Sequence, residues 1–224
     1  MPSSRQPSDR SRQQLRGGIA DTYNLSFTAA SLRPELARIV AECFLAVGDW
    51  ELVKAQILST NALQCRSASS TDRLERELQQ RLQTLTREQL LLVAQATAED
   101  RTAIAWLSVC KRSPFACEFA AEVLRDKLAA HDAVLRPSDY ESYVEHKSLT
   151  HPELARLTPS SKSKIRQVLL KMLTEAGLLV SVRDGAIQRP ALSPAVVRVV
   201  TSDNPRWLAG FLVPDAEIAS HRPP

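Results

Sequence analysis

Apolar side chains recur at helical spacing between about residues 36 and 124. Leu36, Ile39, Val40, Cys43 and Phe44 stand at positions i, i+3, i+4, i+7 and i+8, which places them on one face of a helix. Five later sets of apolar residues also share a helix face: Trp50, Val53 and Ile57; Leu74, Leu78 and Leu82; Leu90, Leu91 and Ala94; Ile104, Leu107 and Cys110; and Phe115, Phe119 and Val123. The pattern predicts a bundle of about five to seven helices over residues 23–135.

Short polar motifs mark where these helices begin and end. Gly48 predicts the end of the first, and Asp49 is a suitable cap for the next. Thr86 with Gln89 reads as a capping box, in which each side chain satisfies a backbone group of the other. Ser113 before a proline predicts one more helix start.

The helical pattern restarts after Leu135 with three shorter segments. Three capping signals open them: Ser138 with Glu141, Thr150 with Glu153, and Thr158 before Pro159. Two β-prone runs follow at 178–183 and 186–189, separated by Asp-Gly, which is a strong hairpin signal. Three helices followed by a hairpin predict a winged helix-turn-helix, whose third helix enters the major groove of DNA.

The third of these helices has an outer face of cations and small polar groups. No acidic side chain occurs from Ser160 to Thr174. Such side chains contact the phosphates and base edges of DNA. Arginines that flank the turn of the predicted hairpin can reach the DNA backbone. The candidate DNA-binding residues are Ser160, Ser161, Lys162, Ser163, Lys164, Arg166, Gln167, Lys171, Arg183 and Arg189. The alternative is that this face is merely solvated, or that the winged module docks another protein.

Charge adds modest support for a polyanionic partner. The net charge is +4, and residues 138–190 carry eight basic and six acidic side chains. Residues 1–22 are rich in Ser, Arg and Gln, which predicts a disordered basic leader that either touches phosphates or only aids solubility. The predicted organisation is thus a leader at 1–22, a helical bundle at 23–135, a winged helix-turn-helix with a trailing helix at 136–205 and a coil at 206–224.

The residue types needed for catalysis or cofactor binding do not form a recognisable pattern. Six glycines make no phosphate loop, and the four cysteines have neither CxxC nor metal-ligand spacing. We therefore expect no cofactor, no metal and no enzymatic activity. The chain has no apolar run that could span a membrane and no secretory signal, so we expect a cytoplasmic protein.

Several stretches resemble the BrxA family of bacteriophage-exclusion (BREX) systems. They are YNLSFTA at 23–29, LAVGDW at 45–50, WLSVCKR at 106–112, HPEL at 151–154, LTP at 157–159, IRQVL at 165–169 and EAGLL at 175–179. The resemblance covers roughly residues 23–200. It implies a mainly all-α protein with a bundle similar to NusB, an RNA-binding antitermination factor, followed by the winged helix-turn-helix with its small β-hairpin wing.

The resemblance also implies a role in phage defence beside a DNA methyltransferase and ATPase components. It supplies no catalytic or DNA-contact residues, so the candidate site depends on the helix-face argument alone. We expect an accessory subunit that binds double-stranded DNA with weak sequence specificity. The alternative is a protein-interaction scaffold within the BREX complex that binds RNA through the bundle.

Overall fold

The computed structural model describes residues 22–221, so the predicted leader lies outside the described residues except for Thr22. The elements of the first half are η1 (Ser26–Ala29), α2 (Pro34–Val47), α3 (Trp50–Thr60), α4 (Ala68–Leu82), α5 (Arg87–Gln95) and α6 (Ala98–Arg112). Those of the second half are α7 (Pro114–Glu118), η2 (Phe119–Leu124), α8 (Arg125–Ala129), α9 (Pro137–Ser148), α10 (Pro152–Ala155), α11 (Pro159–Glu175), α12 (Pro194–Asp203), η3 (Pro205–Phe211) and α13 (Asp215–Ser220). The predicted mainly all-α class is confirmed.

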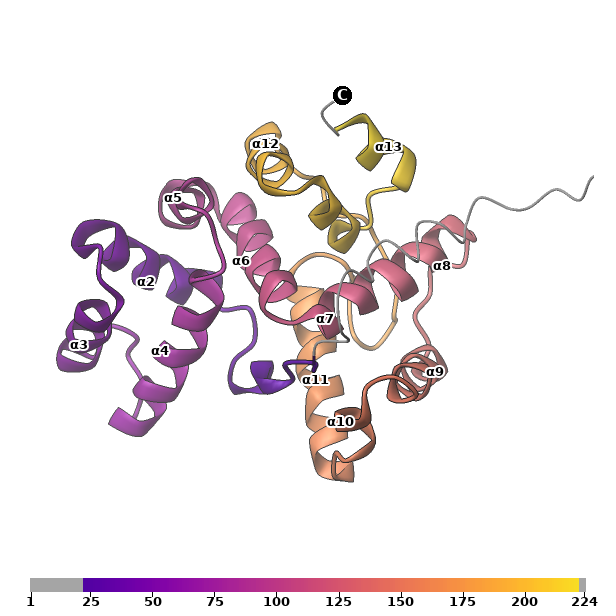
Figure 1. Ribbon diagram of the computed structural model, residues 1–224, viewed down its shortest axis with the longest axis horizontal. Helices are drawn as coiled ribbons and strands as arrows, with labels where there is room; N and C mark the ends of the chain where they lie inside the picture. Colours follow the sequence, from indigo (N-terminus) through magenta and orange to yellow (C-terminus); the bar gives the residue numbers. More distant parts are fainter. Residues whose placement is uncertain (1–21, 222–224) are drawn as a thin grey trace, which may run out of the picture.

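The helices form a bundle at one end and a smaller group at the other. Helices α2 to α5 lie together at one end, and α6 passes through the middle of the molecule (Figure 1). Helices α7, η2 and α8 make one continuous rod with a π-helical turn at its centre. Helices α9, α10 and α11 gather at one side of this rod, and α12 and α13 lie toward the opposite side (Figure 1).

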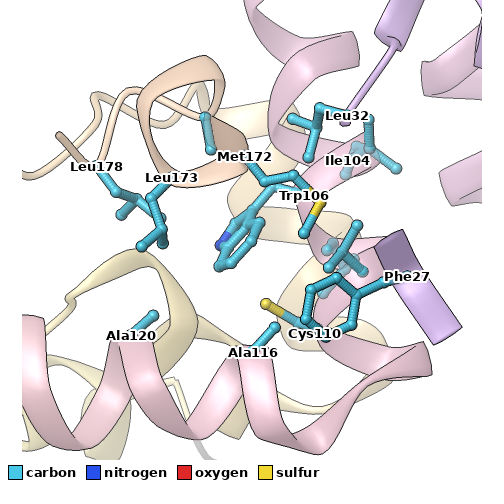
Figure 2. Packing of buried hydrophobic residues seen from close by; sticks show 14 of the residues in the cluster. Phe27, Leu32, Ile104, Trp106, Cys110, Ala116, Ala120, Met172, Leu173 and Leu178 are labelled. Atoms are coloured by element: carbon cyan, nitrogen blue, oxygen red, sulfur yellow. The ribbon is translucent and has the colours of Figure 1, made fainter. Parts of the chain in front are cut away.

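Trp106 of α6 lies at the centre of a single apolar core. Its ring is fully buried, and its indole N–H donates to the carbonyl of Gly210 at 2.9 Å. Met172 and Leu173 of α11 lie on one side of this ring, whereas side chains of α7 and η2 lie on the other (Figure 2). One cluster of buried apolar side chains runs from the bundle into α9 and α11. No break in this core marks the predicted boundary at residue 135.

The cap residues explain most helix starts. Asp49 and Thr158 accept backbone N–H groups as expected, and Thr86 with Gln89 forms the predicted capping box. Two predicted capping boxes are wrong. Helix α9 begins two residues earlier than predicted, at Pro137, with Arg136 in place of Ser138 as its cap residue, and the Asp139 carboxylate accepts the N–H of Arg136 at 2.6 Å.

The second error concerns Glu153, which does not cap its own helix. Its carboxylate accepts the backbone N–H of Tyr23 at 2.6 Å. Helix α10 begins at Pro152 with His151 as its cap residue and without a side-chain cap. The Glu153 carboxylate therefore accepts a hydrogen bond from a distant segment instead of from the start of its own helix.

The prediction of coil from residue 206 is wrong. Asn204 accepts the N–H of Arg206 and opens η3, and α13 follows. Phe211 and Leu212 are buried, so this segment is ordered by the core it covers. Helix α12, which the sequence grouped with the wing, packs on α5, α6 and η3 instead. The C-terminal segment therefore closes the bundle.

Glu75 of α4 is a buried acid without hydrogen-bond partners. Neither carboxylate oxygen meets a donor among the described residues, and burial raises the pKa to about 6. Because the folded-state pKa exceeds the ordinary value of 4.5, the stability from this group is present at low pH and is lost as pH rises through about 6. Ionisation of Glu75 therefore opposes folding at neutral pH.

Glu75→Gln should stabilise the protein in a pH-dependent way. We expect the free energy of unfolding to rise by about 1 kcal/mol at pH 8, with the gain disappearing near pH 4.5, because a neutral amide avoids the buried charge. Urea denaturation at the two pH values measures the difference. A gain of the same size at both would show that ionisation of Glu75 is not the cause.

Candidate nucleic-acid interface

Helix α11 is amphipathic, and its apolar face is fixed against the core. Thr158 caps it by accepting the N–H of Ser161, and Pro159 occupies the first helical position, where a missing N–H costs nothing. The buried face consists of Ile165, Val168, Leu169, Met172 and Leu173. This burial fixes the rotation of the helix and so determines which side chains face solvent.

The opposite face of α11 is exposed and carries most of the predicted residues. Ser160, Lys162, Ser163, Lys164, Gln167 and Lys171 are exposed, whereas Ser161 and Arg166 are half-buried. Lys162 and Lys164 have no carboxylate within ion-pair distance among residues 22–221. The Lys171 ammonium lies 3.8 Å from Glu175, and its side chain remains 57% exposed. Three cations therefore face outward along one helix.

Arg166 is restrained against α9. Its guanidinium lies 5.7 Å from the centre of the Tyr140 ring and 3.8 Å from the Glu141 carboxylate. A cation stacked on an aromatic face is held partly by the ring quadrupole. Arg166 therefore faces the groove between α9 and α11 rather than the centre of the exposed face.

Where the hairpin is predicted, the backbone pairs only through isolated antiparallel bridges, and a third segment takes part. Leu179 pairs with Ile187, and the N–H of Val180 donates to the carbonyl of Ala186 at 2.9 Å. The returning segment also pairs with residues 133–135, through the N–H of Leu135 and the carbonyl of Gly185 at 2.8 Å. Residues 182–184 form a turn instead of continuing the first strand. The result is three backbone segments joined by isolated antiparallel bridges rather than by regular strands, which we call the wing.

Gly185 is required where the wing meets residues 133–135. Its φ is +63°, and a Cβ there would stand 2.3 Å from the carbonyl oxygen of Leu135. Glycine alone accepts both the left-handed backbone and this approach. The turn lies at residues 182–184 rather than at the predicted Asp-Gly pair, of which it includes only Asp184, and the sequence alone does not reveal that Gly185 is needed for its contact with Leu135.

The two predicted wing arginines differ in their surroundings. Arg183 is exposed and has no carboxylate within ion-pair distance in the described part of the chain. The Arg189 guanidinium lies 3.6 Å from Glu217 of α13, which partly offsets its charge. Asp184 at the turn accepts the hydroxyl of Ser181 at 2.8 Å. Arg183 is therefore the freer of the two cations.

An N-terminal segment that sequence reasoning missed lies along α11. Residues 23–32 are attached near both ends of the helix. The N–H of Tyr23 donates to Glu153, and the N–H of Leu32 donates to Glu175 at 2.7 Å. The Tyr23 ring stacks on His151 with 3.7 Å between ring centres. This segment therefore lies along α11, fixed at one end by Glu153 of α10 and at the other by Glu175, the last residue of α11.

Arg81 of α4 fixes this segment from the bundle side. Its side chain is only 3% exposed. The guanidinium donates to the carbonyls of Ala30 and Ser31 at 2.8 Å, to that of Phe27 at 3.2 Å and to Glu77 at 2.8 Å. Burial lowers the pKa of Arg81, but four acceptors surround its charge. The sequence offered no signal for this cluster, because its members are about fifty residues apart.

An apolar groove of about 550 Å³ separates α9 from the first half of α11. Val144, Leu154, Leu157 and Ile165 contribute apolar surface, with Glu141 and Glu145 on the α9 side and Lys162 and Arg166 on the α11 side. Leu149, directly after α9, is 80% exposed. The groove therefore combines an apolar floor with opposite charges on its two sides.

The described residues hold no cluster of three or more His, Cys, Asp or Glu side chains suited to a metal ion. Within residues 22–221, no helix has both the length and the apolar character needed to cross a bilayer. The candidate site consists of α11, the wing and the N-terminal segment, whose contacts are given above.

These features define a mainly helical protein that presents a basic helix face beside three backbone segments joined by isolated bridges. The chain belongs to the BrxA family, whose model matches residues 21–204. It is 28% identical over 164 residues to "BREX protein BrxA" of Escherichia coli O9:H4 (strain HS), an alignment covering 73% of this chain and 77% of that protein. It is 26% identical over 146 residues to "BREX protein BrxA" of Bacillus cereus (strain H3081.97), covering 65% and 73% of the two chains.

The fold also matches a solved structure. A crystal structure of an uncharacterized protein from Magnetospirillum magneticum superposes with a TM-score of 0.75 at 19% sequence identity. The match covers 85% of this chain and 97% of that one. At this identity the likeness concerns the fold alone.

Proposed function

We propose that this chain is an accessory component of a BREX phage-defence system that binds double-stranded DNA without catalysing a reaction. Membership of the BrxA family and the names of both curated relatives support the BREX assignment. The observation that carries DNA binding is the exposed face of α11, where Lys162 and Lys164 lack carboxylate partners among the described residues. Uncompensated cations on one helix suit a phosphate-lined groove.

We assign residues 136–190 to a winged helix-turn-helix. The order of α9, α10 and α11, followed by the pairing of Leu179 with Ile187, supports this assignment. In such modules the third helix lies in the major groove and the wing contacts the adjacent backbone. Helix α11 would then present Lys164, Gln167 and Lys171 to the groove. Arg183 would add a backbone contact from the wing.

The binding should have weak sequence specificity. Lysine meets phosphate as a point charge, and Gln167 is the one amide on the exposed face of α11 that is suited to reading a base edge. We infer that the methyltransferase and ATPase components of the system are protein partners. We propose that the helices of residues 23–135 form a NusB-like bundle. This bundle adds RNA as a second nucleic-acid ligand.

A titration against duplex DNA at about 50 and 200 mM salt, with RNA as competitor, tests the proposal. We expect micromolar affinity at the lower salt and markedly weaker binding at the higher, because cation–phosphate contacts release counterions. Fluorescence anisotropy of a labelled duplex measures both. Tighter competition by RNA than by unlabelled duplex would contradict double-stranded DNA as the main ligand.

The apolar groove favours a second candidate function, docking of another BREX component. Apolar grooves with charged sides commonly take amphipathic helices. On this reading the titration shows no saturable DNA binding, and co-expressed components remain bound after nuclease treatment. Release of those components by nuclease would instead favour a nucleic-acid bridge.

A further inference from the structure

A second hollow, of about 380 Å³, lies between the N-terminal segment and the first half of α11. Its polar lining comes from Ser26 and Thr28 on one side and from Ser161 and Lys164 on the other. Tyr23 and Ile165 are among its apolar walls. The hollow thus joins the YNLSFTA stretch to the basic face of α11.

The polar groups of this hollow are donors and a cation. The hydroxyls of Ser26 and Thr28 have no hydrogen-bond partner among residues 22–221. Ser161 accepts a hydrogen bond from Thr158, which leaves its own proton available to an outside acceptor. Lys164 is exposed, and no acidic side chain lines the hollow. This chemistry suits an anion with several acceptor oxygens.

The two unpartnered hydroxyls are held on a rigid support. Phe27, which separates Ser26 from Thr28, is 3% exposed and is inserted in the core. The carbonyl of Phe27 accepts a hydrogen bond from Arg81, and the N–H of Tyr23 is bound by Glu153. A donor set fixed in advance loses little conformational entropy when a ligand arrives.

We propose that this hollow binds one backbone phosphate of the nucleic acid that follows the exposed face of α11. The inference rests on the proposed function and extends the interface to the N-terminal segment. Lys164 belongs to both the exposed face and the hollow, so a strand that meets Lys164 passes directly beside Ser26 and Thr28. The phosphate oxygens accept from the hydroxyls, and the ammonium of Lys164 offsets the negative charge.

The double variant Ser26→Ala, Thr28→Val tests the proposal. Duplex affinity at fixed salt should fall roughly three- to tenfold, whereas the slope of log affinity against log salt should not change, because hydroxyl groups displace no counterion. Lys164→Ala should lower that slope by about one. The two kinds of contact are thereby distinguished in a single anisotropy series.

The matched control is Ser59→Ala, Thr60→Val, which removes the same two groups from the exposed end of α3. It should leave affinity unchanged, and thermal melting of both double variants checks that each is folded. If Ser26→Ala, Thr28→Val binds like the control while Lys164→Glu, Lys171→Glu weakens binding, the hollow is not a phosphate site and the proposed function stands. If neither weakens binding, both proposals fail.

Inorganic phosphate separates a backbone site from a site for a free anion. Millimolar phosphate should weaken duplex binding only as much as chloride of equal ionic strength, because one hollow without the rest of the interface holds an anion weakly. Saturable binding of phosphate alone, with unchanged duplex binding by Ser26→Ala, Thr28→Val, would assign the hollow to a small anion and overturn the proposal.

Discussion

Lys164→Glu combined with Lys171→Glu should weaken duplex DNA binding roughly 10- to 100-fold and lower the salt slope by about two. Each substitution removes one cation–phosphate contact and adds a repulsive carboxylate at the same point. Both side chains are exposed, so the variant should fold normally. Anisotropy titrations at several salt concentrations measure the affinity and the slope together.

A control with the same change in net charge is available on the bundle. Arg73 and Arg87 are exposed and form no ion pair among residues 22–221, so Arg73→Glu with Arg87→Glu alters total charge equally. This control should change affinity less than threefold. Equal losses in the two variants would mean that net charge, and not the face of α11, governs binding.

Arg81→Ala should lower the free energy of unfolding by about 3–5 kcal/mol. The substitution leaves Glu77 as a buried carboxylate without its cation, and it also frees the carbonyls of Phe27, Ala30 and Ser31. A buried acceptor that loses its donor destabilises the fold by more than the net free energy of the lost hydrogen bond, because water cannot reach the acceptor to replace the donor. Urea denaturation followed by circular dichroism measures the loss.

Arg76→Ala is the comparison for this prediction. Arg76 lies on the same helix and pairs with Asp72, but its side chain is 58% exposed. Its removal should cost less than about 1 kcal/mol. Arg81→Lys keeps a cation near Glu77 without the planar set of donors, so an intermediate loss is expected. A loss below about 1 kcal/mol for Arg81→Ala would show that the buried cluster does not stabilise the fold.

Local patterns predicted the helices and the outward face of α11. The 3.6-residue spacing of Ile165, Leu169 and Met172 identified the buried side correctly, so the exposed side followed from geometry. Thr86 with Gln89 worked for the same reason, since a capping box is formed by neighbours in sequence.

Contacts between distant residues could not be predicted in this way. The pairing of Val134 with Ala186 involves a very short segment before a helix, with no alternation to reveal it. The local pattern predicts that Glu153 caps its own helix, whereas its carboxylate accepts the backbone N–H of Tyr23, 130 residues away in sequence. The order in residues 205–220 arises from burial of Phe211 against the bundle rather than from helical spacing.

The attachment of Leu32 to Glu175 has a consequence for any attempt to divide the molecule. A fragment starting at residue 136 would carry α11 without Trp106, which covers Met172 and Leu173, and without the backbone that occupies Glu175 (Figure 2). In such a fragment the apolar face of α11 would be exposed to water. The basic surface is thus inseparable from residues 32–106, and the two halves should melt as one cooperative unit.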